Sequence, residues 1–153
     1  MTRIKAAVAH AFGQPLSIEE VELARPNSGE VEVTLEACAI CHSDITYLDG
    51  GWGGSLPAVY GHEAAGRISA LGDGVTGLKH GDAVVVTLIR SCGTCPSCCT
   101  GRPTGCEAAY DGDKGPLSMP DGSKLHQAMA SGALAQRVVA AQTPVVKIAE
   151  DIP

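Results

Sequence analysis

Five of the seven cysteines lie between Cys92 and Cys106, and three of them are separated by gaps of two residues. Thiolates at this spacing converge on one metal ion, because the turn between them brings the sulfurs to tetrahedral angles at about 2.3 Å from zinc. Intervening glycines and prolines permit such turns. We therefore predict a closed, structural zinc site with the ligands Cys92, Cys95, Cys98 and Cys106.

Spacing alone leaves alternatives for this cluster. Paired disulfides are disfavoured, because a run of cysteines with two-residue gaps does not suit intrachain disulfide geometry. An iron–sulfur cluster is also compatible with four thiolates. The adjacent Cys98 and Cys99 point to different sides, and spacing does not decide which of them is the ligand.

A second constellation consists of Cys41 and His62, each beside a turn and each followed by an acidic residue. Catalytic zinc keeps three protein ligands and an open position. We interpret this thiolate and imidazole as part of the ligand set of such a site. Asp44 and Glu63 would orient the ligands, and Ser43 would hydrogen-bond an alcohol at the metal. Taken alone, such a pair is more often a buried thiol and a hydrogen-bonded histidine.

These side chains must be positioned by short strands. Alternation of polar and apolar residues and flanking turn residues predict a mostly β protein with short helices, as a small barrel or sandwich. We expect a helical turn after Cys41 that stops at Gly50-Gly51, and a loop over 111–123. The expected strands are 4–9, 30–37, 66–71, 83–89, 138–140 and 145–148.

Composition excludes several classes of function. The 153 residues are 44% hydrophobic, and 17 acidic against 11 basic side chains give a net charge of −6. This balance, without a basic run, argues against nucleic acid and anionic membranes as partners. No stretch approaches the roughly 18 apolar residues of a membrane span, and no signal peptide is evident. We expect a cytoplasmic protein.

One glycine motif is misleading. Gly72 to Gly77 spells G-x-G-x-x-G, but a turn at Gly81-Asp82 follows where a helix should begin. No acidic residue lies between Asp82 and Glu107 to hold a ribose. We therefore predict that this segment does not bind a dinucleotide. His10, His80 and His126 are expected on the surface or in loops.

Three motifs in order give the chain a family resemblance that spans nearly its whole length. Gly61-His62-Glu63, followed by Gly66, Gly72 and Val75, resembles the signature of zinc-containing alcohol dehydrogenases in the medium-chain dehydrogenase/reductase superfamily. The segment 41–44 resembles the family's first catalytic-zinc segment. The cysteine spacing resembles its structural-zinc lobe, which favours Cys98 over Cys99 and zinc over iron–sulfur.

The resemblance implies a GroES-like, partly open β-barrel over residues 1–153, carrying a four-cysteine zinc lobe. It implies catalytic zinc bound by Cys41 and His62, with Glu63 beside the metal and Asp44 supporting His62. The third zinc ligand and the Rossmann cofactor domain would follow residue 153. We therefore expect the 153 residues alone to be inactive.

The resemblance also implies roles for neighbouring residues. Ser43 would carry the alcohol proton away, His42 would contact the cofactor pyrophosphate, and Trp52 and Leu88 would line the substrate pocket. Thr46 stands where many relatives have a histidine that completes the proton relay, so this chain departs from the pattern there.

The implied activity is oxidation of small alcohols to aldehydes or ketones, with zinc as a Lewis acid and NAD or NADP as hydride acceptor. A homo-oligomer is compatible with the complete enzyme. Two alternatives remain: a stand-alone zinc-binding, GroES-like interaction module without catalysis, and a polyol or sugar dehydrogenase of the same superfamily.

Overall fold

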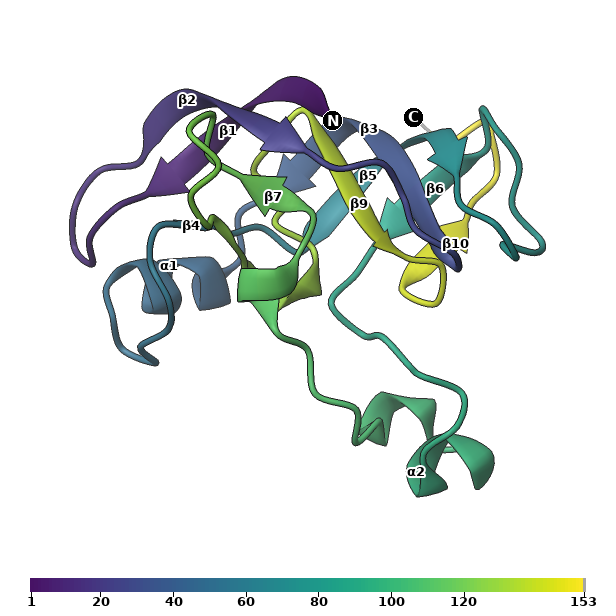
Figure 1. The fold of residues 1–153 in the computed structure, drawn as a ribbon. Helices are drawn as coiled ribbons and strands as arrows, with labels where there is room; N and C mark the ends of the chain where they lie inside the picture. Colours follow the sequence, from purple (N-terminus) through teal and green to yellow (C-terminus); the bar gives the residue numbers. More distant parts are fainter. Residues whose placement is uncertain (153) are drawn as a thin grey trace.

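The computed structural model describes residues 1–152 of the chain (Figure 1). The helices are α1 (His42–Leu48) and α2 (Pro96–Cys99), with the 3-10 turns η1 (Pro103–Gly105), η2 (Gly112–Lys114) and η3 (Ala128–Ala130). The strands are β1 (Thr2–Ala9), β2 (Ser17–Leu23), β3 (Glu30–Ala39), β4 (Ala58–Val59), β5 (Glu63–Leu71), β6 (Ala83–Val86), β7 (Leu117–Ser118), β8 (His126–Gln127), β9 (Arg137–Ala141) and β10 (Val145–Lys147).

The strands form two five-stranded sheets. One has the order β7-β2-β1-β4-β8 and the other β10-β6-β5-β3-β9. All pairs are antiparallel except β4 with β8. In β1 the buried residues Ile4, Ala6 and Val8 alternate with more exposed ones, which is the period of a strand with one face on a core.

Residues 134–136 join the two sheets. The Leu134 carbonyl accepts from the Ala7 N–H at 2.8 Å, and Gln136 connects to both Lys5 and Leu35 through backbone hydrogen bonds of 2.9 and 3.0 Å. The sheets therefore curve into a nearly closed barrel, as the sequence predicts. Figure 1 shows the cysteine-rich segment around α2 projecting away from this barrel.

The core is almost entirely aliphatic, as expected from a chain with 3% aromatic residues. One cluster between β3, β5, β6 and β9 contains Val33, Ile68 and Val84, and a second under β1 and β2 contains Val8 and Leu23. These side chains are at most 1% exposed. The aliphatic core holds the strand ends that carry the candidate site.

Three expectations need correction. The strand expected over 83–89 ends at Val86, because the chain then leaves the sheet toward the cysteine lobe. The loop expected over 111–123 contains η2 and β7. His126, expected at the surface or in a loop, lies in β8, where its ring is partly buried beside Asp113.

The Gly72–Gly77 segment is a turn between β5 and β6, not the start of a helix. Gly72 is needed for packing: a Cβ there would lie 1.7 Å from the Asn27 carbonyl oxygen, and its N–H donates to Glu30. Among the described residues, no helix is long and apolar enough to cross a membrane.

We predict that Gly72→Ala lowers the free energy of unfolding by about 2–3 kcal/mol, because the backbone at Asn27 must move to admit a methyl group. Gly77→Ala is the matched control. Gly77 has a φ of +75° but open space around its Cβ position. Gly77→Ala should therefore lower the free energy of unfolding by only about 1–2 kcal/mol, which is the cost of backbone strain alone. Urea unfolding measures both; equal losses would contradict the packing role of Gly72.

Candidate metal centres

Four sulfurs converge in the cysteine lobe, which we define as residues 87–110. The ligand atoms of Cys92, Cys95, Cys98 and Cys106 all lie within 4.8 Å of one another, and the sulfurs of Cys92 and Cys98 are 4.0 Å apart. Tetrahedral zinc with bonds of about 2.3 Å requires sulfurs separated by just under 4 Å. The four thiols therefore fit a closed zinc site without a large rearrangement.

Hydrogen-bond donors in this lobe lower the pKa of two of the thiols, Cys92 and Cys95. The N–H and hydroxyl of Thr94, together with the N–H of Cys95, lower the pKa of the Cys92 thiol to about 6. The N–H of Glu107 lowers the pKa of Cys95. Burial raises the pKa of Cys98 to about 11. Cys98 must therefore lose its proton when a metal binds, which makes metal binding dependent on pH.

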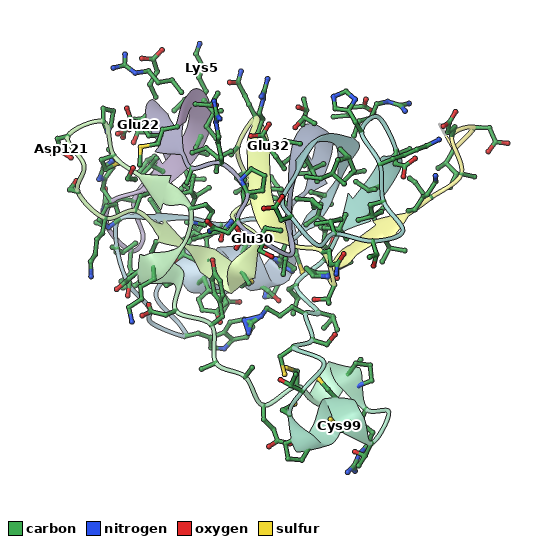
Figure 2. The ribbon with its side chains drawn as sticks, turned by 45° about the vertical axis from the view of Figure 1, so that its right-hand side comes forward. Lys5, Glu22, Glu30, Glu32, Cys99 and Asp121 are labelled. Carbon is green, nitrogen blue, oxygen red and sulfur yellow. The ribbon has the colours of Figure 1, made fainter. Side chains whose placement is uncertain are left out.

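Cys99 is turned away from the cluster. Its thiol faces the carbonyl oxygens of Gly93 and Thr94, at 3.8 and 3.5 Å, and Figure 2 shows it in the projecting lobe. The geometry thus separates two adjacent cysteines that spacing could not, and it groups Cys98 with the other three sulfurs.

Cys41 and His62 also come together, with Glu63. One ligand atom of each residue lies within 4.8 Å of the others. Cys41 precedes α1 as its N-cap residue, and His62 lies immediately before β5. A sulfur, an imidazole nitrogen and a carboxylate oxygen form a donor set that zinc accepts.

Asp44 holds these two ligand segments together. Its side chain is completely buried. One carboxylate oxygen accepts from the Cys41 N–H at 3.0 Å, and the other accepts from the Gly61 N–H at 3.0 Å and lies 3.1 Å from His62 Nδ1. A carboxylate accepts hydrogen bonds, so we expect the imidazole to donate from Nδ1, which directs Nε2 to a metal. Nε2 lies 4.0 Å from the Glu63 carboxylate.

An apolar groove of about 510 Å³ borders this centre. His62 and Glu63 line it together with aliphatic residues that include Val85, Leu88 and Ile89. The groove suits an apolar chain or ring whose polar end meets the Cys41–His62–Glu63 centre.

The other predicted residues lie around α1. Ser43 is half-buried two residues beyond Cys41, and His42 is exposed. The Thr46 hydroxyl donates to the His42 carbonyl at 3.1 Å. Trp52 is 60% exposed and packs edge-on against Tyr47 at 4.9 Å. In the described part of the chain, Trp52 is not among the residues that line the groove, and its role in substrate binding stays a prediction.

Sequence reasoning missed one feature of this region. Tyr60, buried and stacked on Tyr47 at 5.7 Å, packs α1 against the barrel beside the centre. The position of Tyr60 directly before Gly61-His62 is the signal in the sequence that could have predicted this packing, because a buried aromatic side chain fixes the segment that carries it.

The family comparison agrees with this geometry. Residues 27–150 match the family model described as alcohol dehydrogenase GroES-like domain. The matched range contains both candidate metal centres.

Relatives of the chain are alcohol dehydrogenases. It is 41% identical to an NDMA-dependent alcohol dehydrogenase of Amycolatopsis methanolica, over 99% of this chain and 42% of that protein. It is 40% identical to a putative alcohol dehydrogenase D of Mycobacterium tuberculosis, over 97% of this chain and 42% of the relative. The chain thus spans less than half the length of these relatives.

Solved structures share the fold. An alcohol dehydrogenase zinc-binding domain protein from Burkholderia ambifaria has a TM-score of 0.91 and 34% identity, over 99% of this chain and 43% of that one. Benzyl alcohol dehydrogenase from Acinetobacter calcoaceticus has a TM-score of 0.86 and 30% identity, over 100% of this chain and 43% of that one.

We predict that the 153 residues retain close to one zinc per chain after mild chelation, because a closed site of four thiolates binds zinc more tightly than the open Cys41–His62–Glu63 centre. Cys98→Ser should lose this zinc, whereas Cys99→Ser should keep it, since the Cys99 thiol faces away. Metal analysis of the purified variants tests this. Equal zinc loss in both variants would contradict the assignment.

We also predict that Asp44→Asn lowers the free energy of unfolding by about 1.5–3 kcal/mol. An amide has only one oxygen, so its NH₂ group must face an N–H donor that Asp44 now satisfies. The affinity of the Cys41–His62 centre for zinc should fall about 10- to 100-fold. Asp49→Asn, at the exposed end of α1, is the control; unchanged stability in Asp44→Asn would refute the role of this carboxylate.

Proposed function

This chain belongs to the alcohol dehydrogenase GroES-like domain family, and we propose that it forms the zinc-binding catalytic domain of an NAD- or NADP-dependent alcohol dehydrogenase. The observation that carries the proposal is the convergence of Cys41, His62 and Glu63 beside an apolar groove that His62 and Glu63 line. A metal centre beside an apolar groove suits substrates with one hydroxyl and an apolar body. Aldehydes or ketones are the products.

Cys41 and His62 would hold the catalytic zinc, with Glu63 next to it and a further ligand supplied by the rest of the complete protein. Bound zinc supplies a Lewis acid that lowers the pKa of a substrate alcohol. The chain's own contribution is to fix the ligands: Asp44 keeps the His62 ring in one tautomer and Cys41 at the start of α1.

Ser43 is the proposed proton carrier. It lies two residues after Cys41 and is only half-buried, so its hydroxyl can accept the alcohol proton and release one toward solvent. Thr46 is a poor next member of this relay, because its hydroxyl already donates to the His42 carbonyl. The proton therefore passes from Ser43 to water.

NAD or NADP accepts the hydride that leaves the carbinol carbon, and His42, exposed at the start of α1, is the proposed contact to its pyrophosphate. We further infer a cytoplasmic protein that acts on small alcohols and does not bind nucleic acid, in keeping with its net charge of −6. Assembly of the complete enzyme into a homo-oligomer is part of the same proposal.

We predict that Ser43→Ala in the complete protein lowers kcat/KM for alcohol oxidation about 10²- to 10⁴-fold, the usual contribution of positioned proton transfer. Ser43→Thr should restore activity, because it returns a hydroxyl to the same place. Zinc content should stay unchanged in both variants. Near-normal turnover by a zinc-loaded Ser43→Ala enzyme would mean that the proton leaves by another route.

The 153-residue domain alone should neither bind NAD or NADP saturably at micromolar concentrations nor reduce them with an alcohol, because its G-x-G-x-x-G segment is a packing turn. Calorimetric titration of the zinc-loaded domain measures this. Saturable binding would place the cofactor site within these residues.

A further inference from the structure

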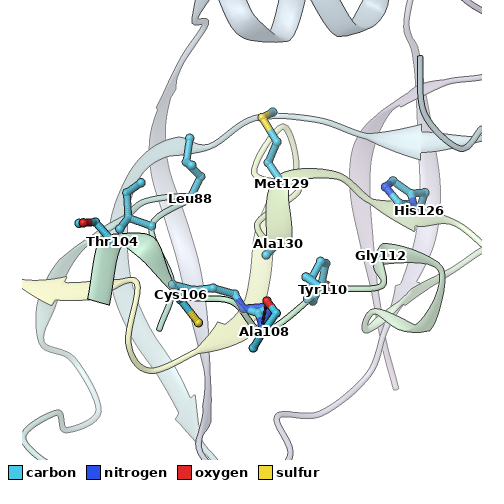
Figure 3. Close-up of a pocket in the computed structure, with 11 residues that line it drawn as sticks. Leu88, Thr104, Cys106, Ala108, Tyr110, Gly112, His126, Met129 and Ala130 are labelled. Atoms are coloured by element: carbon cyan, nitrogen blue, oxygen red, sulfur yellow. Dashed lines mark hydrogen bonds between the residues drawn. The ribbon is translucent and has the colours of Figure 1, made fainter. Parts of the chain in front are cut away.

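Two segments join the cysteine lobe to the barrel. The outgoing segment, residues 87–91, follows β6, and the returning segment, residues 107–110, leads back toward η2. A hollow of about 380 Å³ lies where they meet the barrel, and Figure 3 shows Leu88 from the outgoing segment and Tyr110 from the returning one around it. The outgoing segment also supplies Leu88 and Ile89 to the wall of the apolar groove beside the metal centre.

The outgoing segment has little backbone support where it borders the apolar groove. Within residues 1–152, the backbone of Leu88 and Ile89 makes no hydrogen bond to the barrel, and the Ile89 N–H donates only to the Thr87 hydroxyl, at 3.2 Å. Thr87 and Ser91, on either side, each donate one N–H to the segment 143–144, at 3.1 and 3.2 Å. The side-chain contacts of this segment therefore decide where its groove-lining residues lie.

Arg90 clamps the outgoing segment to the returning one. Its Nη2 donates to the carbonyl oxygens of Ala108 and Ala109 at 3.2 and 3.3 Å. Its guanidinium carbon lies 5.2 Å from the centre of the Tyr110 ring. A planar guanidinium can stack on an aromatic ring and donate hydrogen bonds at its edge at the same time. Because Arg90 directly follows Ile89, the position of Ile89 depends on that of the returning segment.

Tyr110 in turn ties the returning segment to the barrel. Its hydroxyl donates to the side-chain oxygen of Gln127 in β8. Gln127 is 2% exposed, and its NH₂ group donates to the carbonyl oxygens of Ser131 and Val139 at 2.9 and 3.0 Å, so its oxygen has to face Tyr110. Burial raises the pKa of Tyr110 to about 12, so the hydroxyl keeps the proton that it donates near neutral pH. This contact anchors the lobe on a buried, fixed amide.

These contacts form a chain from the buried amide to the wall of the apolar groove. We propose that Gln127, Tyr110 and Arg90 are positioning residues that hold Leu88 and Ile89 in place and thereby set which alcohols the complete enzyme prefers. In the described part of the chain, none of the three lines the apolar groove. The inference rests on the proposed function and deepens it: the favoured substrates are alcohols whose apolar body reaches Leu88 and Ile89.

The kinetic test starts with Tyr110→Phe in the complete protein, which removes the hydroxyl and keeps the ring. For the longer primary alcohols KM should rise about 3- to 10-fold with kcat unchanged, which is the usual effect of one lost hydrogen bond on binding. KM for ethanol should not change, because ethanol has almost no apolar surface to place against Leu88 and Ile89. Thr100→Val is the matched control, since this lobe hydroxyl bonds only to the carbonyls of residues 96 and 97.

Gln127→Met separates positioning from direct contact with the substrate. It removes the acceptor of the Tyr110 hydroxyl, so it should reproduce the KM pattern of Tyr110→Phe, and the double variant should behave like Gln127→Met alone. A KM effect of Tyr110→Phe that a folded Gln127→Met does not share would overturn the inference, because Tyr110 would then contact the substrate itself. If Gln127→Met does not fold, the kinetics of Tyr110→Phe and the following measurement carry the test.

NMR tests the chain of contacts without turnover. In the zinc-loaded protein, Tyr110→Phe and Arg90→Lys should each shift the methyl signals of Leu88 and Ile89 and leave those of Val86, the last residue of β6, in place. Unshifted methyl signals in both variants at normal zinc content, or unchanged KM values for the longer alcohols, would overturn the inference alone. Failure to oxidise any alcohol would refute the proposed function, and the methyl shifts would still decide whether these residues position the groove wall.

Discussion

The buried carboxylate of Asp44 is the interaction on which the candidate catalytic centre depends. Removing a carboxylate from water is costly unless its oxygens are fully hydrogen-bonded. Here the donors come from separate segments: the Cys41 N–H at the start of α1, and the Gly61 N–H and His62 ring before β5. Satisfying one charge thus brings both candidate zinc ligands to the same place.

The same connection closes the barrel. Gly61 has a φ of +96°, and a Cβ there would lie 2.6 Å from the Leu134 nitrogen. The Gly61 carbonyl accepts from Ala133, and the Tyr60 carbonyl accepts from Leu134, in the segment that links the two sheets. The His62 position therefore cannot shift without disturbing the barrel, which gives the centre a rigid support.

The two metal centres differ in how far they could be predicted from sequence. The four-cysteine site is local in the chain, so spacing and turn residues predict that a cluster of sulfurs converges there. The choice between the adjacent Cys98 and Cys99 needs the family resemblance or the geometry. The Cys41–His62 centre joins residues 21 positions apart. From the sequence, only the family resemblance made a metal site the better interpretation of this pair. Its geometry follows from Asp44, whose burial no local pattern reveals.

Other features depended on tertiary contacts. The apolar run after Ala83 predicts a strand to residue 89, but the strand ends at Val86, and Leu88 and Ile89 line the apolar groove instead. β2 escaped prediction because Ile18, on its exposed face, is 70% accessible and breaks the alternation. His126 looked like a surface histidine, because Asp113 and Gly112 come beside it only in the folded chain.

The central claim is that Asp44 holds the His62 ring with Nδ1 protonated and Nε2 directed to a metal. Long-range ¹H–¹⁵N NMR of the imidazole rings measures this directly, before and after zinc is added to the protein. The account predicts that His62 carries its proton on Nδ1 in both states and that its Nε2 signal shifts when the second zinc binds. A proton on Nε2, or an Nε2 signal indifferent to zinc, would contradict it.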